Sequence, residues 1–282
     1  MRLLEVLFRK EVFMEVKKTE KYNLLWEYML GITKENICVA FSGGVDSALL
    51  LKMACAAGEE NNTSVFAITA NTMLHPKGDI EIAENLANDM GAVFKTVKVD
   101  ELRDAGIENN PPNRCYLCKR EIFRKIKEKC REYGVKTIIE GTNSDDLNEY
   151  RPGIKALKEL EIVSPLAELG ICKKEVREMA GLLGISVANR PSTPCLATRL
   201  PYNSTINYEL LERINDGENF IRNLGFYNVR LRIHDCIARI EVDYEDIEKL
   251  VSYKEQVTEY LKKLGYKYVT VDLNGFMSGR ME

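Results

Sequence analysis

Six consecutive residues, Ser42 to Ser47, have the composition of a phosphate-binding loop. They separate an apolar run at 37–41, which predicts a buried strand, from an apolar run at 48–54, which predicts a helix. Two glycines let backbone N–H groups approach an anion, and the helix N-terminus and two serine hydroxyls add donors. The loop lacks the lysine with which a Walker A loop binds phosphates and has an acid, Asp46, instead. This acid indicates that Mg²⁺ neutralises the phosphates. The predicted phosphate-binding residues are Ser42, Gly43, Gly44, Asp46 and Ser47.

Three cysteines form a second group with chemical potential. Cys115 and Cys118 have Cys-Xaa-Xaa-Cys spacing and precede a basic helix expected at 121–133, whose N-terminal end would favour the thiolate form. Cys195 lies in a long irregular segment at 185–206, and irregular segments of this length in compact proteins are often functional. A lone Cys-Xaa-Xaa-Cys is compatible with zinc, a redox dithiol or a metal cluster.

The elements around the loop predict an α/β protein with a doubly wound parallel sheet. Strands expected at 37–41, 64–70, 92–99 and 135–140 alternate with helices. Ligands of such sheets bind beyond the carboxyl ends of the strands, so Thr72 should line the same crevice as the phosphate loop. The polar tail after the last of these strands, Gly141-Thr142-Asn143-Ser144-Asp145-Asp146, should reach the same edge.

Beyond residue 206 the sequence predicts a second, smaller α/β domain of two helices and three strands. We therefore expect a nucleotide-binding domain at 14–184, a junction loop at 185–206 that contains Cys195, and a C-terminal domain for substrate binding or oligomerisation at 207–282. Arg230 and Arg232 fall on one face of a predicted strand.

Composition limits the function classes. The chain has 282 residues, 45% hydrophobic and 29% charged, with a net charge of −3. The sequence pI near 5.8 disfavours a dedicated nucleic-acid binder. The absence of an apolar run of membrane-spanning length and of a signal peptide predicts a cytoplasmic protein without a membrane partner. The eight cysteines are therefore expected to be thiols, ligands or catalysts, not a disulfide framework.

The Ser-Gly-Gly-Xaa-Asp-Ser pattern resembles the PP-loop of the ATP pyrophosphatases, adenine nucleotide alpha-hydrolases with a Rossmann-like fold. Within that superfamily, further stretches spread over residues 36 to 276 are similar to the LarE branch of ATP-dependent sulfur insertases, which help to make the nickel-pincer cofactor of lactate racemase. These stretches are Pro112 to Lys119, Glu140 to Asn143, Tyr150 to Gly153, Cys195 to Tyr202, Arg230 to Arg232, Ala238 to Val242 and Asp272 to Phe276.

The resemblance implies that ATP adenylates the carboxylates of pyridinium-3,5-dicarboxylate mononucleotide and that sulfur then displaces AMP. It assigns Thr142 and Asp145 to the nucleotide or metal side of the crevice and implies a homo-oligomer. An anionic substrate of this kind suits arginine, whose planar donors match carboxylate and phosphate. The candidate substrate-binding residues are Thr198, Arg199, Glu218, Arg230, Arg232 and Glu241.

The sulfur source stays open at this stage. Cys115, Cys118 and Cys195 would supply three ligands to a 4Fe-4S cluster and leave one iron open for a sulfide from an external source. Alternatively, Cys195 gives up its own sulfur. Other functions compatible with the sequence are a cluster-dependent tRNA thiolase, an amide-forming PP-loop ligase, and a non-catalytic zinc-bound nucleotide sensor.

Overall fold

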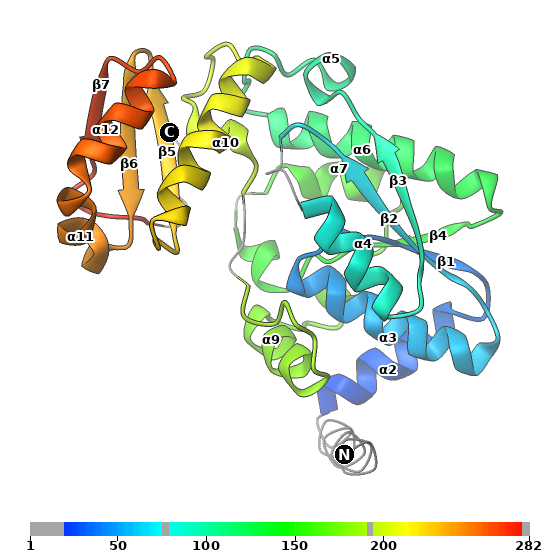
Figure 1. Cartoon of the computed structure of the whole chain (residues 1–282). Coiled ribbons are helices and arrows are strands. Elements are labelled where there is room, and N and C mark those ends of the chain that lie inside the picture. The colour runs from blue at the N-terminus through cyan, green and yellow to red at the C-terminus, as the bar shows by residue number, and fades with distance from the viewer. Residues whose placement is uncertain (1–19, 75–78, 150, 191–193, 278–282) are drawn as a thin grey trace. The chain divides into compact units, whose positions relative to one another are not determined.

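The computed structural model describes residues 20–74, 79–149, 151–190 and 194–277 (Figure 1). The described residues form two compact units. The first unit takes residues 20–72, 79–99 and 115–190 with the gap at 150, and the second takes 73–74, 100–114 and 194–277. Residues 14–19 of the predicted first domain and 191–193 of the predicted junction loop lie outside the described residues.

The first unit is built on a parallel sheet whose described strands have the order β3-β2-β1-β4. The strands are β1 (Ile37–Ala40), β2 (Val65–Asn71), β3 (Val93–Lys98) and β4 (Thr137–Ile139). Val39 of β1 lies opposite Ala67 of β2 on one side and Ile139 of β4 on the other. The chain therefore extends the sheet outward from β1 through β2 and β3, and then returns to add β4 on the opposite side. Ligand crevices in doubly wound sheets open where the strand order reverses in this way.

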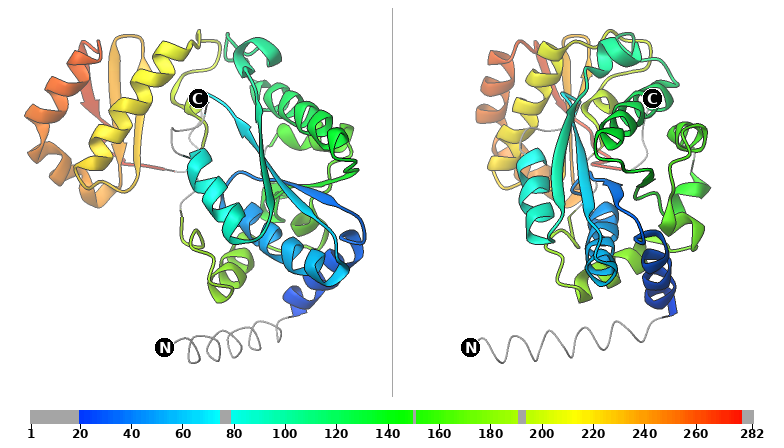
Figure 2. Two further views of the ribbon diagram at one scale, coloured as in Figure 1. Left: turned by 45° about the vertical axis from the view of Figure 1, so that its right-hand side comes forward. Right: turned by 90° about the vertical axis from the view of Figure 1, so that its right-hand side faces the viewer.

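Helices cover both faces of this sheet (Figures 1 and 2). The apolar cluster on one face takes residues from α2, α3, α4 and α9, and the cluster on the other face takes residues from α6 and α7. The helices of the unit are α2 (Glu20–Ile32), α3 (Val45–Asn61), α4 (Asp79–Asp89), α6 (Arg114–Glu132), η1 (Asp145–Asn148), α7 (Gly153–Glu159), α8 (Pro165–Glu168) and α9 (Lys173–Leu182).

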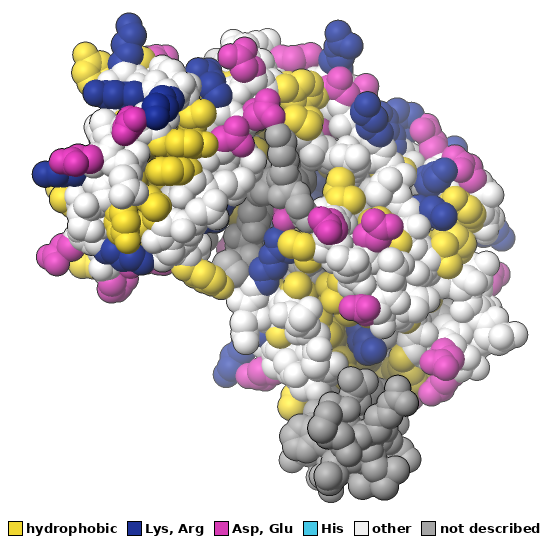
Figure 3. Space-filling view, viewed as in Figure 1, with side chains coloured by type: hydrophobic (Ala, Val, Ile, Leu, Met, Phe, Trp, Pro, Cys, Tyr) yellow, Lys and Arg dark blue, Asp and Glu magenta, His cyan; other side chains and the backbone are white. Residues whose placement is uncertain are grey.

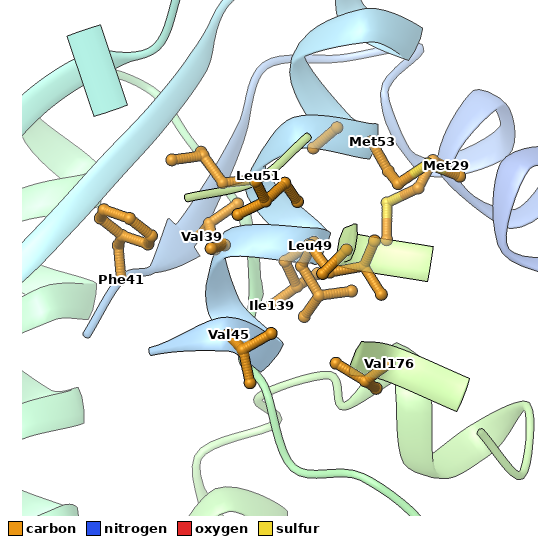
Figure 4. Close-up of a cluster of buried hydrophobic side chains, with 14 of the residues drawn as sticks. Met29, Val39, Phe41, Val45, Leu49, Leu51, Met53, Ile139 and Val176 are labelled. Carbon is orange, nitrogen blue, oxygen red and sulfur yellow. The ribbon is translucent and has the colours of Figure 1, made fainter. Parts of the chain in front are cut away.

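The central strand β1 is buried on both faces, which explains why its sequence is continuously apolar. Val39 packs with Leu49 and Leu51 of α3 in the cluster that Figure 4 shows, whereas its neighbour Cys38 belongs to the cluster on the other face. Burial of this strand and of α3 holds the loop that connects them at a fixed place on the sheet edge.

The second unit contains a smaller mixed sheet of order β5-β6-β7, in which β5 and β6 are antiparallel and β6 and β7 are parallel. Its strands are β5 (Val229–His234), β6 (Ile237–Val242) and β7 (Tyr268–Val271), and its helices are α5 (Glu101–Ala105), η2 (Leu196–Arg199), α10 (Tyr208–Asn223), η3 (Tyr244–Asp246), α11 (Ile247–Ser252) and α12 (Lys254–Lys263). The predicted fold class, a doubly wound α/β sheet with a second smaller α/β domain, is confirmed.

The division of the chain differs from the predicted ranges at several places. Residues 73–74 and 100–114, which fall within the predicted first domain, belong to the second unit, and residues 185–190 of the predicted junction loop belong to the first. The Asn110 amide donates hydrogen bonds to the carbonyls of Leu200 (3.2 Å) and Pro201 (2.7 Å), and the Ile206 N–H donates to the Glu108 carbonyl (2.6 Å). These long-range bonds leave no signal in local sequence composition.

The surface carries charges of both signs. The face seen in Figure 3 shows acidic and basic side chains interspersed over both units. Among the described residues, no helix is both long and apolar enough to cross a membrane.

Candidate functional site

The Ser42 to Ser47 loop connects β1 to α3, as predicted. Gly44 occupies the N-cap of α3 in an extended conformation. The Ser47 hydroxyl donates to the Gly44 carbonyl (3.0 Å) and accepts from the Ser42 N–H (3.3 Å), so the loop is closed by its own side chains. The N–H groups of the first turn of α3 have no partner within a helix, and an anion at this terminus would satisfy them.

Gly43 is required by the backbone of the loop. Its φ is +71°, in the left-handed region that favours glycine, and a Cβ at this position would lie 3.4 Å from the Cβ of Ala83 on α4. The loop therefore turns sharply while packed against a neighbouring helix.

Asp46 is the centre of a polar network at the carboxyl ends of β1 and β4. Its Oδ1 accepts a hydrogen bond from the Asn143 amide (3.2 Å), and its Oδ2 forms an ion pair with Lys173 of α9. A Cβ on Gly141 would lie 3.0 Å from the Asp46 Cβ, which shows how closely the segment after β4 approaches the phosphate loop. Because β4 is hydrogen-bonded to β1, the two loops emerge side by side.

The residues after β4 hold one another and α9 in place. Asp145 Oδ2 accepts from the Lys173 N–H (2.8 Å), and Asp146 accepts from the Asn143 N–H (3.1 Å) and pairs with Arg151 (2.8 Å). Burial raises the pKa of the Asp146 carboxyl despite these favourable contacts. Thr142 is buried and donates its N–H to Glu140 (2.9 Å).

Thr72 directly follows β2 at the same sheet edge. The assignments of Thr72, Thr142 and Asp145 to a nucleotide or metal stay predictions.

The donor set around Asp46 fits Mg²⁺. The carboxylates of Asp46 and Asp145 come from adjacent loops, and Mg²⁺ prefers one or two carboxylates together with phosphate oxygens. The Asn143 amide oxygen is already engaged by the N–H groups of Asp145 (3.0 Å) and Asp146 (3.3 Å). The Lys173 ammonium now supplies the positive charge beside Asp46, whose side chain is 18% exposed. Mg²⁺ would compete with Lys173 for this carboxylate.

Cys115 and Cys118 lie in the opening turns of α6, which begins seven residues earlier than the predicted helix. Their spacing of three residues places both half-buried thiols on one helix face. Among the described residues of the first unit, no third Cys, His, Asp or Glu joins them in a metal-binding group. A metal cluster on this pair would therefore need a ligand from elsewhere.

Cys195 lies in the second unit, at the N-cap of η2, and is also half-buried. Its carbonyl accepts from the Thr198 N–H (3.0 Å) and hydroxyl (2.8 Å) and from the Arg199 guanidinium (3.2 Å). The short helix and its arginine therefore hold the backbone of Cys195.

Arg199 and Glu218 form a buried ion pair inside the second unit. Both side chains are completely excluded from solvent, and Arg199 donates two hydrogen bonds to Glu218 (2.7 and 3.0 Å). Glu218 also accepts from Arg222 (2.6 Å) and from the Leu231 N–H at the outer edge of β5 (3.0 Å). Burial alone would raise the pKa of the Glu218 carboxyl, but these partners lower it below its usual range. The pair thus holds η2, α10 and β5 together.

The charged face of the second sheet consists of Arg230, Arg232, Arg239 and Glu241, which lie opposite one another in the β5–β6 register. Glu241 Oε1 accepts from Arg232 (2.6 Å) and Arg239 (3.2 Å), and Arg232 also donates to the Thr198 carbonyl (2.8 Å). The buried Glu241 Oε2 and Arg239 Nε have no hydrogen-bond partner among the described residues. Arg239 also pairs with Asp272 (3.8 Å). Three guanidinium groups against these two carboxylates leave the face with a net positive charge and with hydrogen-bonding capacity for a ligand.

Arg230 is buried on this face with its guanidinium 4.8 Å from the centre of the Phe276 ring. Burial and the positive charge of Arg199 lower the pKa of Arg230 to about 10. An anionic ligand would relieve this repulsion. The substrate assignments of Thr198, Arg199, Glu218, Arg230, Arg232 and Glu241 stay predictions.

The sequence interpretation did not identify Lys173, Asn143 or Arg239 as site residues. Lys173 lies 127 positions from Asp46 and gave no motif signal at the start of an ordinary amphipathic helix. Arg239 was detectable, because alternation along a strand puts it on the same face as Glu241.

Comparison with known proteins places this geometry in a family. A PP-loop domain matches residues 14–151. The pyridinium-3,5-bisthiocarboxylic acid mononucleotide synthase of Lactiplantibacillus plantarum is 36% identical over 248 residues, which cover 88% of this chain and 89% of that protein. The chain belongs to the LarE-like PP-loop sulfur insertases.

The chain is also similar to two other relatives. An uncharacterized protein of Synechocystis is 37% identical over 86% of this chain and 90% of its own length. The tRNA-specific 2-thiouridylase MnmA of Rickettsia felis is 27% identical over 63% of this chain and 58% of that protein. Membership in the LarE-like group makes this chain an ATP-using, sulfur-transferring enzyme.

We predict that Lys173→Ala tightens binding of Mn²⁺, a spectroscopic substitute for Mg²⁺, to the nucleotide-free protein by roughly fivefold. Removing the ammonium leaves the Asp46 charge to the metal, and a partly exposed pair is worth about 1 kcal/mol. Electron paramagnetic resonance titration measures the change. Lys174→Ala is the matched control, because the Lys174 side chain is 85% exposed. Equal Mn²⁺ affinity in the two variants would contradict competition for Asp46.

We also predict that Glu218→Ala lowers the free energy of unfolding of the second unit by about 3–5 kcal/mol, because it leaves the Arg199 charge buried without a partner. Urea unfolding followed by circular dichroism measures the loss. Glu209→Ala on the exposed side of the same helix should cost less than about 1 kcal/mol. Similar losses in both variants would show that Glu218 is not a structural charge.

Proposed function

We propose that this protein converts the carboxylates of pyridinium-3,5-dicarboxylate mononucleotide to thiocarboxylates, with sulfur delivered through a 4Fe-4S cluster on Cys115, Cys118 and Cys195. The observation that carries the proposal is the presence, in one compact unit, of the PP-loop and of two half-buried thiols in the opening turns of α6. The printed name of the Lactiplantibacillus plantarum relative supplies the chemical class of the product.

The first half of the reaction is adenylation. A substrate carboxylate oxygen attacks the α-phosphorus of ATP, the bond to the β-phosphate breaks, and pyrophosphate leaves. Bound Mg²⁺ would neutralise the charge of the phosphates. The loop of Ser42 to Ser47 would bind the leaving phosphates, with Asp46 holding the metal. Lys173, once released from Asp46, would contribute a further positive charge at the same place.

The second half is sulfur transfer. Hydrosulfide attacks the acyl carbon, the carbon–sulfur bond forms, the acyl–oxygen bond breaks, and a thiocarboxylate, AMP and a proton are released. A cluster held by Cys115, Cys118 and Cys195 would supply the sulfide for this attack. Two rounds convert both carboxylates.

The charged face of the second sheet is the proposed site for the anionic substrate. Arg230, Arg232 and Arg239 supply the positive charge, and Glu241 keeps an unpaired buried oxygen. Arg199 and Glu218 already pair with each other, so they would support this face without binding the substrate directly. Thr198 lies at its border through the contact with Arg232.

Two variants of the proposal predict different products. If Cys195 gives up its own sulfur, each chain completes one transfer and keeps dehydroalanine at that position. If the substrate is a tRNA, as the name of the Rickettsia felis relative suggests, the protein should retain tRNA in a filter-binding assay.

The experiment compares Cys195→Ser and Cys115→Ser with the wild type after purification and reconstitution without oxygen. We expect the wild type to bind iron and acid-labile sulfide and to turn over repeatedly with ATP and sodium sulfide, because an open iron can be reloaded. Both variants should lose iron, acid-labile sulfide and repeated turnover together, since three ligands act as one unit. Mass spectrometry and metal analysis provide the readout.

Cys236→Ser is the matched control, because Cys236 is another half-buried cysteine of the second unit and should leave the iron content unchanged. An iron-free wild type that stops after one transfer and contains dehydroalanine at position 195 would replace the cluster proposal with the sacrificial mechanism.

A further inference from the structure

A second lysine occupies the nucleotide side of the first unit without an assigned role. Lys119 follows Cys118 on α6, and its ammonium lies 3.7 Å from Oε2 of Glu140, the residue that follows β4. The Lys119 side chain is 38% exposed, whereas that of Glu140 is 8% exposed. A positive charge is thus held at the carboxyl end of the strand that borders the PP-loop.

The Glu140 carboxylate is held in place by hydrogen bonds that do not involve Lys119. Its Oε1 accepts hydrogen bonds from the Thr142 N–H (2.9 Å) and the Ser164 hydroxyl (2.5 Å). The separation of 3.7 Å between Oε2 and the ammonium exceeds a hydrogen-bond length, so the attraction is electrostatic and leaves the N–H donors of Lys119 able to bind another acceptor.

The direction of the Lys119 side chain is also determined by its surroundings. A Cβ on Gly153, the first residue of α7, would lie 2.7 Å from Cδ, 3.3 Å from Cγ and 3.4 Å from Cε of Lys119. The aliphatic stem therefore runs directly over the glycine, and any larger residue would displace it. This contact gives a physical reason for a glycine at this position.

Helix geometry links Lys119 to the thiols. Cys115 lies four residues before Lys119 and three before Cys118, so the three side chains share one side of α6 near its N-terminus. Glu140, which pairs with Lys119, directly precedes Gly141. Gly141 packs against Asp46 and Ser47 at the start of α3. Lys119 thus shares a helix side with the thiol pair and is paired with the residue that precedes Gly141, all within one unit.

Stability does not account for this arrangement. A partly exposed ion pair without a hydrogen bond contributes little to stability, and Glu140 already has two donors. Three separate features, a buried carboxylate, a glycine under the stem and the helix register, nevertheless direct one cation to one place.

We infer that Lys119 is a positioning residue for sulfur transfer, whose ammonium binds the anionic sulfur nucleophile on its path from the thiol side to the adenylated carboxylate. The inference rests on the proposed sulfur insertase function. The Lys119 ammonium exchanges its ion pair with Glu140 for an ion pair with the hydrosulfide anion. Lys119 forms no covalent bond and undergoes no oxidation or reduction.

The test separates the two half-reactions in holoenzyme supplied with ATP, the dicarboxylate mononucleotide and sodium sulfide. For Lys119→Ala we expect thiocarboxylate formation to fall about 10- to 100-fold, as for loss of one charge-assisted hydrogen bond, with a higher KM for sulfide. Substrate-dependent pyrophosphate release in the first turnover and iron content should stay within about twofold of wild type. Lys119→Arg should recover part of the loss, and Lys125→Met on the same helix is the control.

Gly153→Ala provides an independent variant that leaves Lys119 in the sequence. It should reduce thiocarboxylate formation in the same direction, because the added methyl displaces the lysine stem. In the Lys119→Ala background, Gly153→Ala should cause no further loss, since no stem is left to displace.

An unchanged rate of thiocarboxylate formation in Lys119→Ala, an equal loss of pyrophosphate release, or a loss of iron would each overturn this role and leave the proposed function intact. Absence of thiocarboxylate from the wild-type reaction would overturn both.

Discussion

The hydrogen-bonded pairing of β4 with β1 is the constraint on which the nucleotide site depends. It brings the segment after β4 against the loop after β1, so that Asn143 reaches Asp46 and Gly141 packs on the start of α3. Without this reversal of strand order, the loop of Ser42 to Ser47 would be a glycine-rich turn with no partner segment. The crevice is therefore a property of sheet topology, and the loop only supplies its phosphate-binding half.

Two lysine–carboxylate pairs of the first unit share the same arrangement. Lys173 pairs with Asp46 and Lys119 pairs with Glu140, and each carboxylate is oriented by neutral donors from the segment at 142–164. Each lysine is more exposed than its acid. Under the proposed function, these two cations would be available to pyrophosphate and to the sulfur nucleophile respectively.

The second unit separates structural charges from those available to a ligand. Arg199 and Glu218 are buried and satisfy each other, and Glu218 also protects the outer edge of β5 through the Leu231 N–H. On the charged face of the sheet, Arg230 has a lowered pKa, and one oxygen of Glu241 has no hydrogen-bond partner within the described part of the chain. The sequence grouped all of these arginines and glutamates as candidate substrate-binding residues. The structure separates the buried, mutually paired residues from those that could bind a ligand.

The features that depend on neighbouring residues could be predicted from the sequence. The phosphate loop, the parallel α/β class and the paired thiols follow from local periodicity and from residue types at short spacing, and the structure agrees on the strands, on most helices and on the position of the loop. The fold class is confirmed for the same reason. The start of α6 was predicted seven residues too late, because the helix begins at Arg114 and not at Glu121.

Contacts between side chains that are distant in the sequence could not be predicted in this way. Lys173 pairs with Asp46 from 127 positions away, Arg199 is enclosed by Glu218, and Gly153 makes room for Lys119. Residues 100–114 join the second unit for the same reason, through bonds to a segment about 90 positions later. These contacts depend on strand order, register and helix packing, which act through space and leave no periodicity in the chain.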